Sequence, residues 1–258
     1  MILSEIRDSV GYLSLNNPAK LNALSAQLVN ELVAALEDYK VQKVRAVVLT
    51  AAPNKHNVWS AGHDVSELPT GRRDPLGYFD HLEILLRAIQ AFPAPIIARI
   101  HGSVWGGACD LTMCCDMVVA DNSATFAITP AKLGIPYNAS GIVHFLSRLN
   151  LNIAKEMFFT ATPVDAATAE RWMIVNHLVE EAELDATIDT MLKAILNNSP
   201  MSIAIIKEQI RVLAEARPLS PDNFERIQGL RRKCYDSYDY AEGVQSFKEK
   251  RKPIFRGE

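Results

Sequence analysis

Two short glycine turns hold the residues best suited to chemistry, "SAGHD" (60–64) and "WGGACD" (105–110), and each follows a run typical of a β-strand. Glycine permits a turn in which consecutive N–H groups point outward without partners. The second turn also opens a helical run, so its amides gain the positive end of the helix dipole. Two such turns that face each other can bind an oxygen carrying negative charge. The pattern predicts an oxyanion hole for acyl-transfer or enolate chemistry, with two ordinary strand-to-helix turns as the alternative.

The four cysteines, Cys109, Cys114, Cys115 and Cys234, do not have the spacing of a metal site. Small buried residues in a reducing compartment are the simplest interpretation. A thiol nucleophile at Cys109, beside the second glycine turn, is the alternative. The sequence also lacks HExxH, CxxC, GxxxxGK(S/T) and the Rossmann glycine fingerprint. It therefore predicts neither a metal site nor nucleotide-phosphate chemistry.

The elements that position the two turns alternate between β-rich and helical runs through the first two thirds of the chain. Strands are predicted at 10–16, 44–52, 95–104 and 124–128, helices at 24–40 and 78–92, and a helix followed by a strand at 108–120. Ser25 is the expected N-cap of the first helix, whose leucines recur every four residues. This alternation predicts βαβ units and hence an α/β fold. From about residue 150 the pattern is helical, apart from a short strand predicted at 175–179.

Length and composition indicate an ordinary globular protein. The chain has 258 residues, of which 48% are apolar and 22% charged, which is enough for a full hydrophobic core. Its net charge of −3 provides no basic field for nucleic acid. The apolar runs are shorter than a membrane span, and residues 1–12 do not have the pattern of a signal peptide. We therefore expect a cytoplasmic enzyme without nucleic-acid or membrane partners.

Five segments, in order and spread over essentially the whole chain, resemble the crotonase (enoyl-CoA hydratase/isomerase) superfamily. They are "KLNALS" (20–25), "WSAGHDVSEL" (59–68), "PIIARIHGSVWGGACDLTMCCDMVVA" (95–120), "ATFAITPAKLGIPYNASG" (124–141) and "FKEKRKPIFRG" (247–257). The resemblance implies a β-β-α spiral core, here 1–195, which binds acyl-CoA and holds the active site. It also implies a helical C-terminal trimerisation region, here 196–258, and a homotrimer or a dimer of trimers. Coenzyme A would be part of the substrate, and no separate cofactor is expected.

Carried over by position, the two amides that hold a thioester enolate in this family are the N–H groups of His63 and Gly107. At position 63 the site then needs the peptide N–H, which the imidazole cannot replace. A direct role of the His63 imidazole in proton transfer is the alternative.

The chain departs from the hydratases of the family at their two catalytic glutamates. Asp110 stands in the first place and Ala131 in the second, so half of the acid/base pair that hydration needs is missing. Tyr137 and the run "SAGHDVSELPTGRRDPL" (60–76) resemble instead the biotin-independent decarboxylases of the superfamily. Their implied reaction is the decarboxylation of methylmalonyl-CoA, or of malonyl-CoA, to propionyl-CoA or acetyl-CoA. An enoyl-CoA hydratase or isomerase and a non-catalytic scaffold of the same fold are the alternatives.

The decarboxylase resemblance also implies roles for side chains. A malonyl-type thioester needs orientation of its carboxylate and stabilisation of the enolate, rather than a base. Tyr137 would hold the carboxylate, unless it is simply a core aromatic. Asp110 would position a water or a proton donor, or simply lie in the first turn of a helix.

Substrate-binding candidates follow from the shape of an acyl-CoA. They are Ala61, Gly62, His63, Asp64, Val65, Gly107 and Thr129 at the thioester and acyl group, with Lys20 and Lys250 at the nucleotide end. For assembly, Ile203, Ile206, Ile210 and Leu213 form an apolar stripe that suits a subunit interface or packing within one subunit.

Overall fold

A six-stranded sheet forms the centre of the computed structural model, in which residues 1–68, 74, 76–216 and 218–258 are described. In sheet order its strands are β1 (Ile2–Arg7), β2 (Val10–Leu15), β3 (Ala46–Ala51), β5 (Ile96–Ile100), β7 (Met117–Asp121) and β10 (His177–Val179). β1 is antiparallel to β2, and the other neighbours are parallel. Parallel neighbours need crossover connections, so the predicted α/β class is confirmed.

A smaller second sheet carries the predicted turns. Its order is β4 (Val58–Ser60), β6 (Ser103–Trp105), β8 (Thr125–Ala127) and β9 (Val164–Asp165). β4, β6 and β8 are parallel to one another, so the chain leaves all three strands at the same end of the sheet. The turns at 61–63 and 106–107 and the start of 3-10 helix η3 (Pro130–Leu133) therefore emerge side by side.

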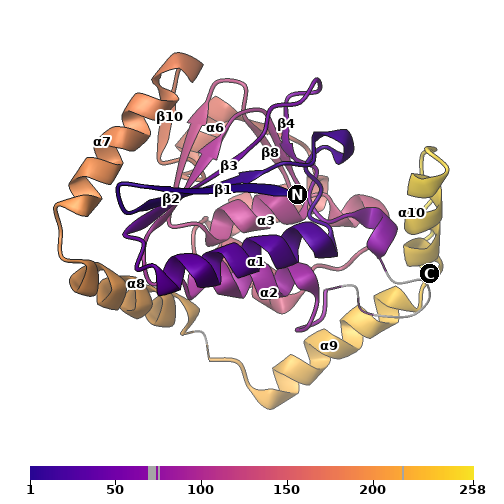
Figure 1. Ribbon diagram of the computed structural model, residues 1–258. Coiled ribbons are helices and arrows are strands. Elements are labelled where there is room, and N and C mark those ends of the chain that lie inside the picture. Colours follow the sequence, from indigo (N-terminus) through magenta and orange to yellow (C-terminus); the bar gives the residue numbers. More distant parts are fainter. Residues whose placement is uncertain (69–73, 75, 217) are drawn as a thin grey trace.

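Helices cover the sheets and then extend beyond them (Figure 1). They are α1 (Ala26–Val41), α2 (His81–Gln90), α3 (Gly107–Cys114), α4 (Ala139–Leu146), α5 (Leu151–Thr160), α6 (Ala166–Arg171), α7 (Leu184–Leu196), α8 (Pro200–Glu215), α9 (Pro221–Tyr235) and α10 (Tyr238–Lys248). Ser25 caps α1 as predicted, since its hydroxyl accepts from the N–H of Leu28. The helix predicted from 78 begins only at His81, because Asp80 accepts from the N–H of Leu82 and caps it.

The single strand predicted at 95–104 is wrong, because the chain turns at Gly102 (φ +70°) and β5 and β6 belong to different sheets. Three further strands were not predicted, each for a physical reason. β1 lies at a sheet edge and is mostly exposed, so it lacks the alternation of a half-buried strand. β4 and β9 have three and two residues, which is too short for any periodicity to show.

The helix α10 reaches η3, at the same end of the small sheet, from outside. Figure 1 shows α9 and α10 together at one edge of the molecule. A Cβ atom at Gly134, directly after η3, would lie 2.6 Å from the Asp239 carbonyl oxygen of α10. One at Gly243 in α10 would collide with the Leu133 carbonyl oxygen of η3. α10 therefore packs directly against η3, and the region 196–258 contacts the core that was predicted to end at 195.

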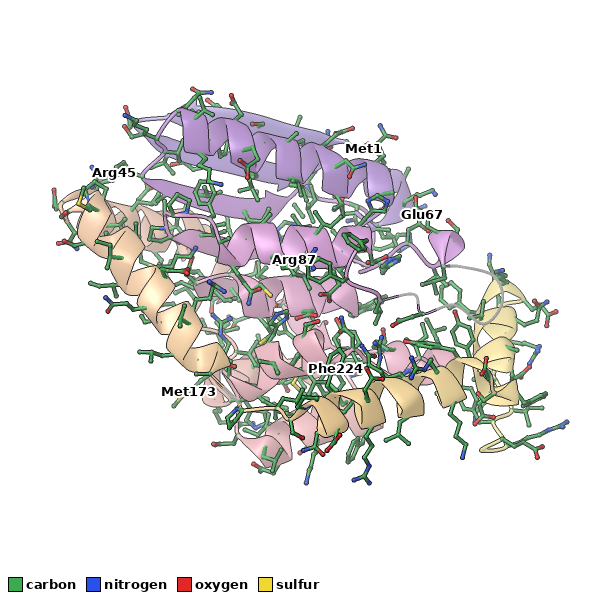
Figure 2. All side chains as sticks on the ribbon, turned by 90° about the horizontal axis from the view of Figure 1, so that it is seen from below. Met1, Arg45, Glu67, Arg87, Met173 and Phe224 are labelled. Atoms are coloured by element: carbon green, nitrogen blue, oxygen red, sulfur yellow. The ribbon has the colours of Figure 1, made fainter. Side chains whose placement is uncertain are left out.

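Apolar side chains remain exposed along α8 and α9. Figure 2 shows α9, with Phe224 labelled, on the outside of the molecule. In α8 the exposed fractions of Ile206, Ile210 and Leu213 are 53%, 62% and 74%. These three side chains are more than half exposed, whereas Ile203 is half-buried. Among the described residues, no helix combines the length and apolar character needed to cross a membrane.

Candidate active site

The two glycine turns bring the N–H groups of His63 and Gly107 together. Gly62 (φ +83°) and Gly106 (φ +55°) adopt backbone conformations that favour glycine. A Cβ atom built at Gly62 would lie 2.9 Å from the Gly107 nitrogen, and one at Gly107 would lie 3.4 Å from the His63 nitrogen. The backbones therefore approach more closely than side chains would allow.

The backbone amides next to these two donate hydrogen bonds within the protein. The N–H of Ala61 donates to Leu21, that of Gly62 to the Ser60 hydroxyl, and that of Asp64 to Leu24. By contrast, no acceptor lies within hydrogen-bonding distance of the His63 or Gly107 N–H among the described residues. Gly107 is also the first residue of α3, where the helix dipole adds positive potential. This pair of free donors has the geometry of an oxyanion hole.

A pocket opens in front of the two amides, and its wall is mostly apolar. Its lining residues are Ala61, His63, Val65, Leu68, Leu76, Leu82, Gly106, Gly107, Thr129, Pro130, Leu133, Ile135 and Tyr137. The structure thus brings together six of the predicted residues: Ala61, His63, Val65, Gly107, Thr129 and Tyr137. No carboxylate lies among these lining residues of the described chain.

The His63 side chain is held by oxygen atoms on both sides. Its Nε2 lies 3.3 Å from Asp80 Oδ2, and its Nδ1 lies 3.2 Å from the Asp64 carbonyl oxygen. Burial disfavours the charged imidazole, but the hydrogen bond and the charge of Asp80 outweigh it, so the pKa of His63 is raised. The doubly protonated ring satisfies both acceptors at once.

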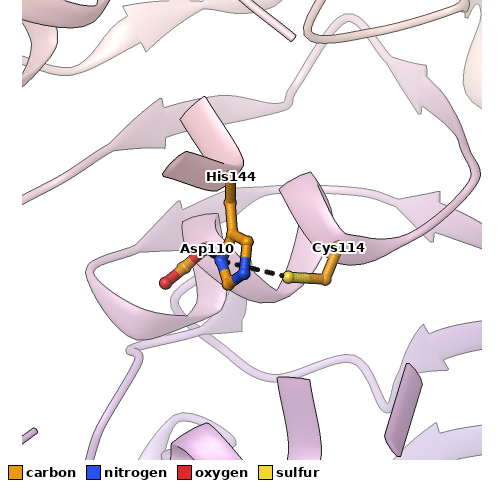
Figure 3. A group of neighbouring side chains, drawn as sticks. All are labelled: Asp110, Cys114 and His144. Carbon is orange, nitrogen blue, oxygen red and sulfur yellow. Dashed lines mark hydrogen bonds and ion pairs between the residues drawn. The ribbon is translucent and has the colours of Figure 1, made fainter. Parts of the chain in front are cut away.

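A second group of side chains lies behind the pocket wall (Figure 3). The Tyr137 hydroxyl donates to Asp110 Oδ2 at 2.6 Å, and His144 Nδ1 lies 2.7 Å from Asp110 Oδ1. Asp110 is completely buried in α3, and Cys114, one turn further along the same helix, has its Sγ 3.4 Å from His144 Nδ1. The ring of Tyr137 therefore lies in the pocket wall, and its hydroxyl group donates its hydrogen bond to Asp110.

Asp110, Cys114 and His144 could also be considered as metal ligands, because their ligand atoms lie within 4.8 Å of one another. Metal binding needs the thiolate. Burial and the neighbouring Asp110 charge raise the pKa of the Cys114 thiol well above its ordinary value. The 2.7 Å contact between His144 and Asp110 is itself a hydrogen-bonding distance. The arrangement is that of a hydrogen-bonded cluster, and the expectation of no metal stays a prediction.

The Cys109 thiol is a poor nucleophile here. Cys109 is fully buried in α3, and burial followed by the charge of Asp110 raises its pKa. All four cysteines are free, and only Cys234 is partly exposed. The interpretation as small buried residues therefore holds for the other three.

At the position of the second catalytic glutamate of the hydratases, this chain has no side chain that could act as acid or base. Ala131 is exposed on η3 and does not line the pocket. The buried Glu83 of α2 lies close enough to Asp110 to interact with its charge. Its oxygens, however, accept hydrogen bonds from the Asn138 amide and the Ser140 hydroxyl. Burial raises the pKa of Glu83. Glu83 thereby fixes the start of α4, whose N-cap is Asn138.

Other predicted binding residues lie outside the pocket lining. The Asp64 carboxylate accepts from Ser66 and from Lys20, whose Nζ lies 3.1 Å away. Lys20 is largely exposed beside the His63 turn, which suits contact with a nucleotide. Lys250 is exposed just after α10. Part of the run 60–76 that carried the decarboxylase resemblance lies outside the described residues.

Sequence reasoning missed His144, Cys114 and Asp80 as parts of the site. Asp110 and Cys114 are four residues apart, so a shared helix face was readable. Tyr137 and His144 are seven apart, but only packing of α4 on α3 brings His144 to Asp110. No local pattern in the sequence predicts the contact between His144 and Asp110.

Comparisons with known proteins agree with this geometry. A family model described as enoyl-CoA hydratase/isomerase matches residues 5–258. The methylmalonyl-CoA decarboxylase of Escherichia coli (strain K12) is 46% identical over 250 residues, which cover 97% of this chain and 95% of that protein. The carnitinyl-CoA dehydratase of the same strain is 30% identical over 257 residues, 96% of this chain and 95% of that protein.

A solved structure of a methylmalonyl-CoA decarboxylase in complex with 2-nitronate-propionyl-CoA superposes with a TM-score of 0.97. It is 45% identical to this chain, and the match covers 100% of this chain and 98% of that one. The expected crotonase fold and the resemblance to the decarboxylating members are thereby confirmed.

Proposed function

The chain belongs to the enoyl-CoA hydratase/isomerase family, and from this premise we propose that it decarboxylates methylmalonyl-CoA to propionyl-CoA. The observation that carries the proposal is a pair of amides that find no acceptor among the described residues and face a pocket whose described lining has no carboxylate. The 46% identity to a methylmalonyl-CoA decarboxylase supports the same reaction.

In this mechanism the thioester oxygen accepts from the N–H groups of His63 and Gly107. The pocket holds the bond between the α-carbon and the carboxylate perpendicular to the thioester plane. When that bond breaks, CO2 leaves and the electron pair of the broken bond stays with the α-carbon to form the enolate. The two amides stabilise the negative oxygen of this enolate. The α-carbon then takes up one proton. An acidic lining residue would repel the substrate carboxylate, which accounts for the apolar wall.

We assign Tyr137 and Thr129 to the acyl carboxylate, because both line the pocket beside the paired amides. We assign the backbone at 61–65 to the thioester and pantetheine, and Lys20 to the nucleotide end. We also assign Lys250 to the nucleotide end, which it would contact from an adjacent subunit. Mutation of Lys20 or Lys250 to Ala should raise KM for the CoA ester and leave kcat unchanged.

Assembly as a homotrimer or a dimer of trimers is supported by the exposed apolar face of α8. A stripe that packs within one subunit would be buried, whereas Ile206, Ile210 and Leu213 are more than half exposed. Sedimentation at micromolar concentration tests this, and a monomer would contradict it.

We further propose that the enzyme works without biotin or another cofactor, because decarboxylation of a malonyl-type thioester needs only orientation and enolate stabilisation. The expected compartment is the cytoplasm, where four free cysteines would stay reduced.

Two assays test the reaction. Release of CO2 is measured with methylmalonyl-, malonyl- and ethylmalonyl-CoA, and we expect release from at least the first. Loss of the conjugated-thioester absorbance of crotonyl-CoA is measured in parallel. Rapid hydration without CO2 release would overturn the proposal in favour of a hydratase, and no reaction in either assay would favour a scaffold.

A further inference from the structure

The proton of Tyr137 poses a problem for its predicted role. A tyrosine hydroxyl has one proton, and here Tyr137 donates it to Asp110 Oδ2 at 2.6 Å. To donate to a substrate carboxylate instead, Tyr137 needs Asp110 to be protonated, so that the carboxyl group donates to the tyrosine oxygen. The buried Asp110 must then receive a proton from another group.

His144 is the group in position to supply it. Its Nδ1 lies 2.7 Å from Asp110 Oδ1, the oxygen that Tyr137 does not use. His144 also lines a second pocket, between α3, α4 and α8, which shares no lining residue with the pocket in front of the amides. Tyr137 thus faces one pocket, His144 faces another, and the buried Asp110 joins them.

We propose that His144 delivers the proton that decarboxylation consumes, from the second pocket through Asp110 to Tyr137. His144 acts through Asp110 and is a positioning residue, while Tyr137 touches the substrate. This inference rests on the proposed decarboxylase function.

The proton transfers balance. After CO2 has left, the Tyr137 hydroxyl gives its proton to the enolate α-carbon, and its oxygen takes the proton of the Asp110 carboxyl group. Asp110 then takes a proton from His144, and His144 takes one from water in the second pocket. The net reaction consumes one solvent proton and forms CO2 and propionyl-CoA. Burial holds the pKa of Tyr137 well above its ordinary value, so the phenolate left by this transfer readily takes the proton of the Asp110 carboxyl group.

Charged groups face His144 from α2, α3 and α8 and from its own helix, α4. Asp110 and Cys114 face it from α3, and the charge of Glu83 in α2 is close enough to interact with it. Arg148 on its own helix and Lys207 and Arg211 on α8 line the same second pocket. Arg148 donates to the carbonyls of 112, 115 and 116, and Lys207 is paired with Asp116. Groups of both charges therefore surround the imidazole, whose Nδ1 reaches Asp110 while the residue borders the second pocket.

The test uses His144→Gln, whose amide N–H can still donate to Asp110 but cannot carry a proton. The matched control is His177→Gln, the same change at an exposed histidine on β10. Exchange of the α-protons of propionyl-CoA in D2O, followed by mass spectrometry, measures proton delivery without the decarboxylation step. We expect exchange to fall by about tenfold or more in His144→Gln and to stay unchanged in the control. KM and propionyl-CoA affinity should be retained, and the pH profile of exchange should lose its histidine-range limb.

Unchanged exchange and an unchanged pH profile in His144→Gln would overturn the relay. If that variant does not fold, His144→Asn is measured with the same expectation and the same overturning result. Release of CO2 from methylmalonyl-CoA by the wild type is measured first. Its absence would refute the proposed function, whereas CO2 release with unaffected exchange in the variants refutes only the relay.

Discussion

The two halves of the site are built in different ways. The proposed oxyanion hole at 62–63 and 106–107 consists of backbone, and strand ends and glycines with positive φ set the positions of its two donors. The opposite half consists of side chains, Tyr137, Asp110 and His144, joined by hydrogen bonds across α3 and α4. The first half should tolerate changes of side chain but no added Cβ atom. The second should respond to the loss of a single polar atom.

Gly62→Ala should have the largest effect, because it adds a Cβ atom to the backbone half. That atom would collide with the Trp105 carbonyl oxygen, and φ at this position is +83°. Displacing one donor of an oxyanion hole costs about a hundredfold or more in kcat. Steady-state decarboxylation measures the loss. Gly77→Ala is the control, since nothing lies within 4 Å of its Cβ position; equal rates in the two variants would contradict the backbone assignment.

Tyr137→Phe tests the side-chain half by removing one oxygen while the ring keeps its packing against Phe158. A lost hydrogen bond to a charged group is worth about 1.5–3 kcal/mol, or roughly ten- to a hundredfold in rate. We expect the loss in kcat, with propionyl-CoA affinity unchanged. Wild-type turnover would remove Tyr137 from the mechanism.

His63→Ala should have a smaller effect, because the peptide N–H remains. We expect kcat to fall by less than about tenfold. Complete loss of activity with the fold and CoA affinity intact would show instead that the imidazole acts directly, and would blur the distinction between the two halves.

The His63–Asp80 pair also links stability to pH. The folded pKa of His63 is raised, so its stabilising effect is full below the unfolded value of about 6.5 and is lost as pH rises through the folded value. Asp80→Asn removes the carboxylate but keeps a good N-cap for α2. Urea unfolding should show a larger loss of stability at about pH 6 than at about pH 9. In a background of His63→Gln, the loss of stability caused by Asp80→Asn should be the same at both pH values.

Treatment with EDTA should have the smallest effect. If the Asp110–Cys114–His144 group is a hydrogen-bonded cluster, chelation leaves kcat and the melting temperature unchanged. A drop in either, restored by a divalent metal, would show that the cluster holds an ion.

The backbone half was predictable from sequence and the side-chain half only in part. Glycines at strand ends are local signals, and with the family resemblance they led to His63 and Gly107. Tyr137 and Asp110 were found by their places in motifs, but their mutual hydrogen bond depends on how α4 packs on α3. His144 has no motif, and Asp80 looks like any helix cap. The boundary at 195 stays a prediction.

The contact between α10 and η3 has a consequence for synthesis of the protein. Leu133 forms part of the pocket wall, and α10, more than a hundred residues later in the chain than its glycine turns, packs against it. A nascent chain can therefore form its glycine turns early and still lack support for that wall until α10 has left the ribosome. Chains whose translation stops before α10 should lack this support, and we expect them to have no catalytic activity.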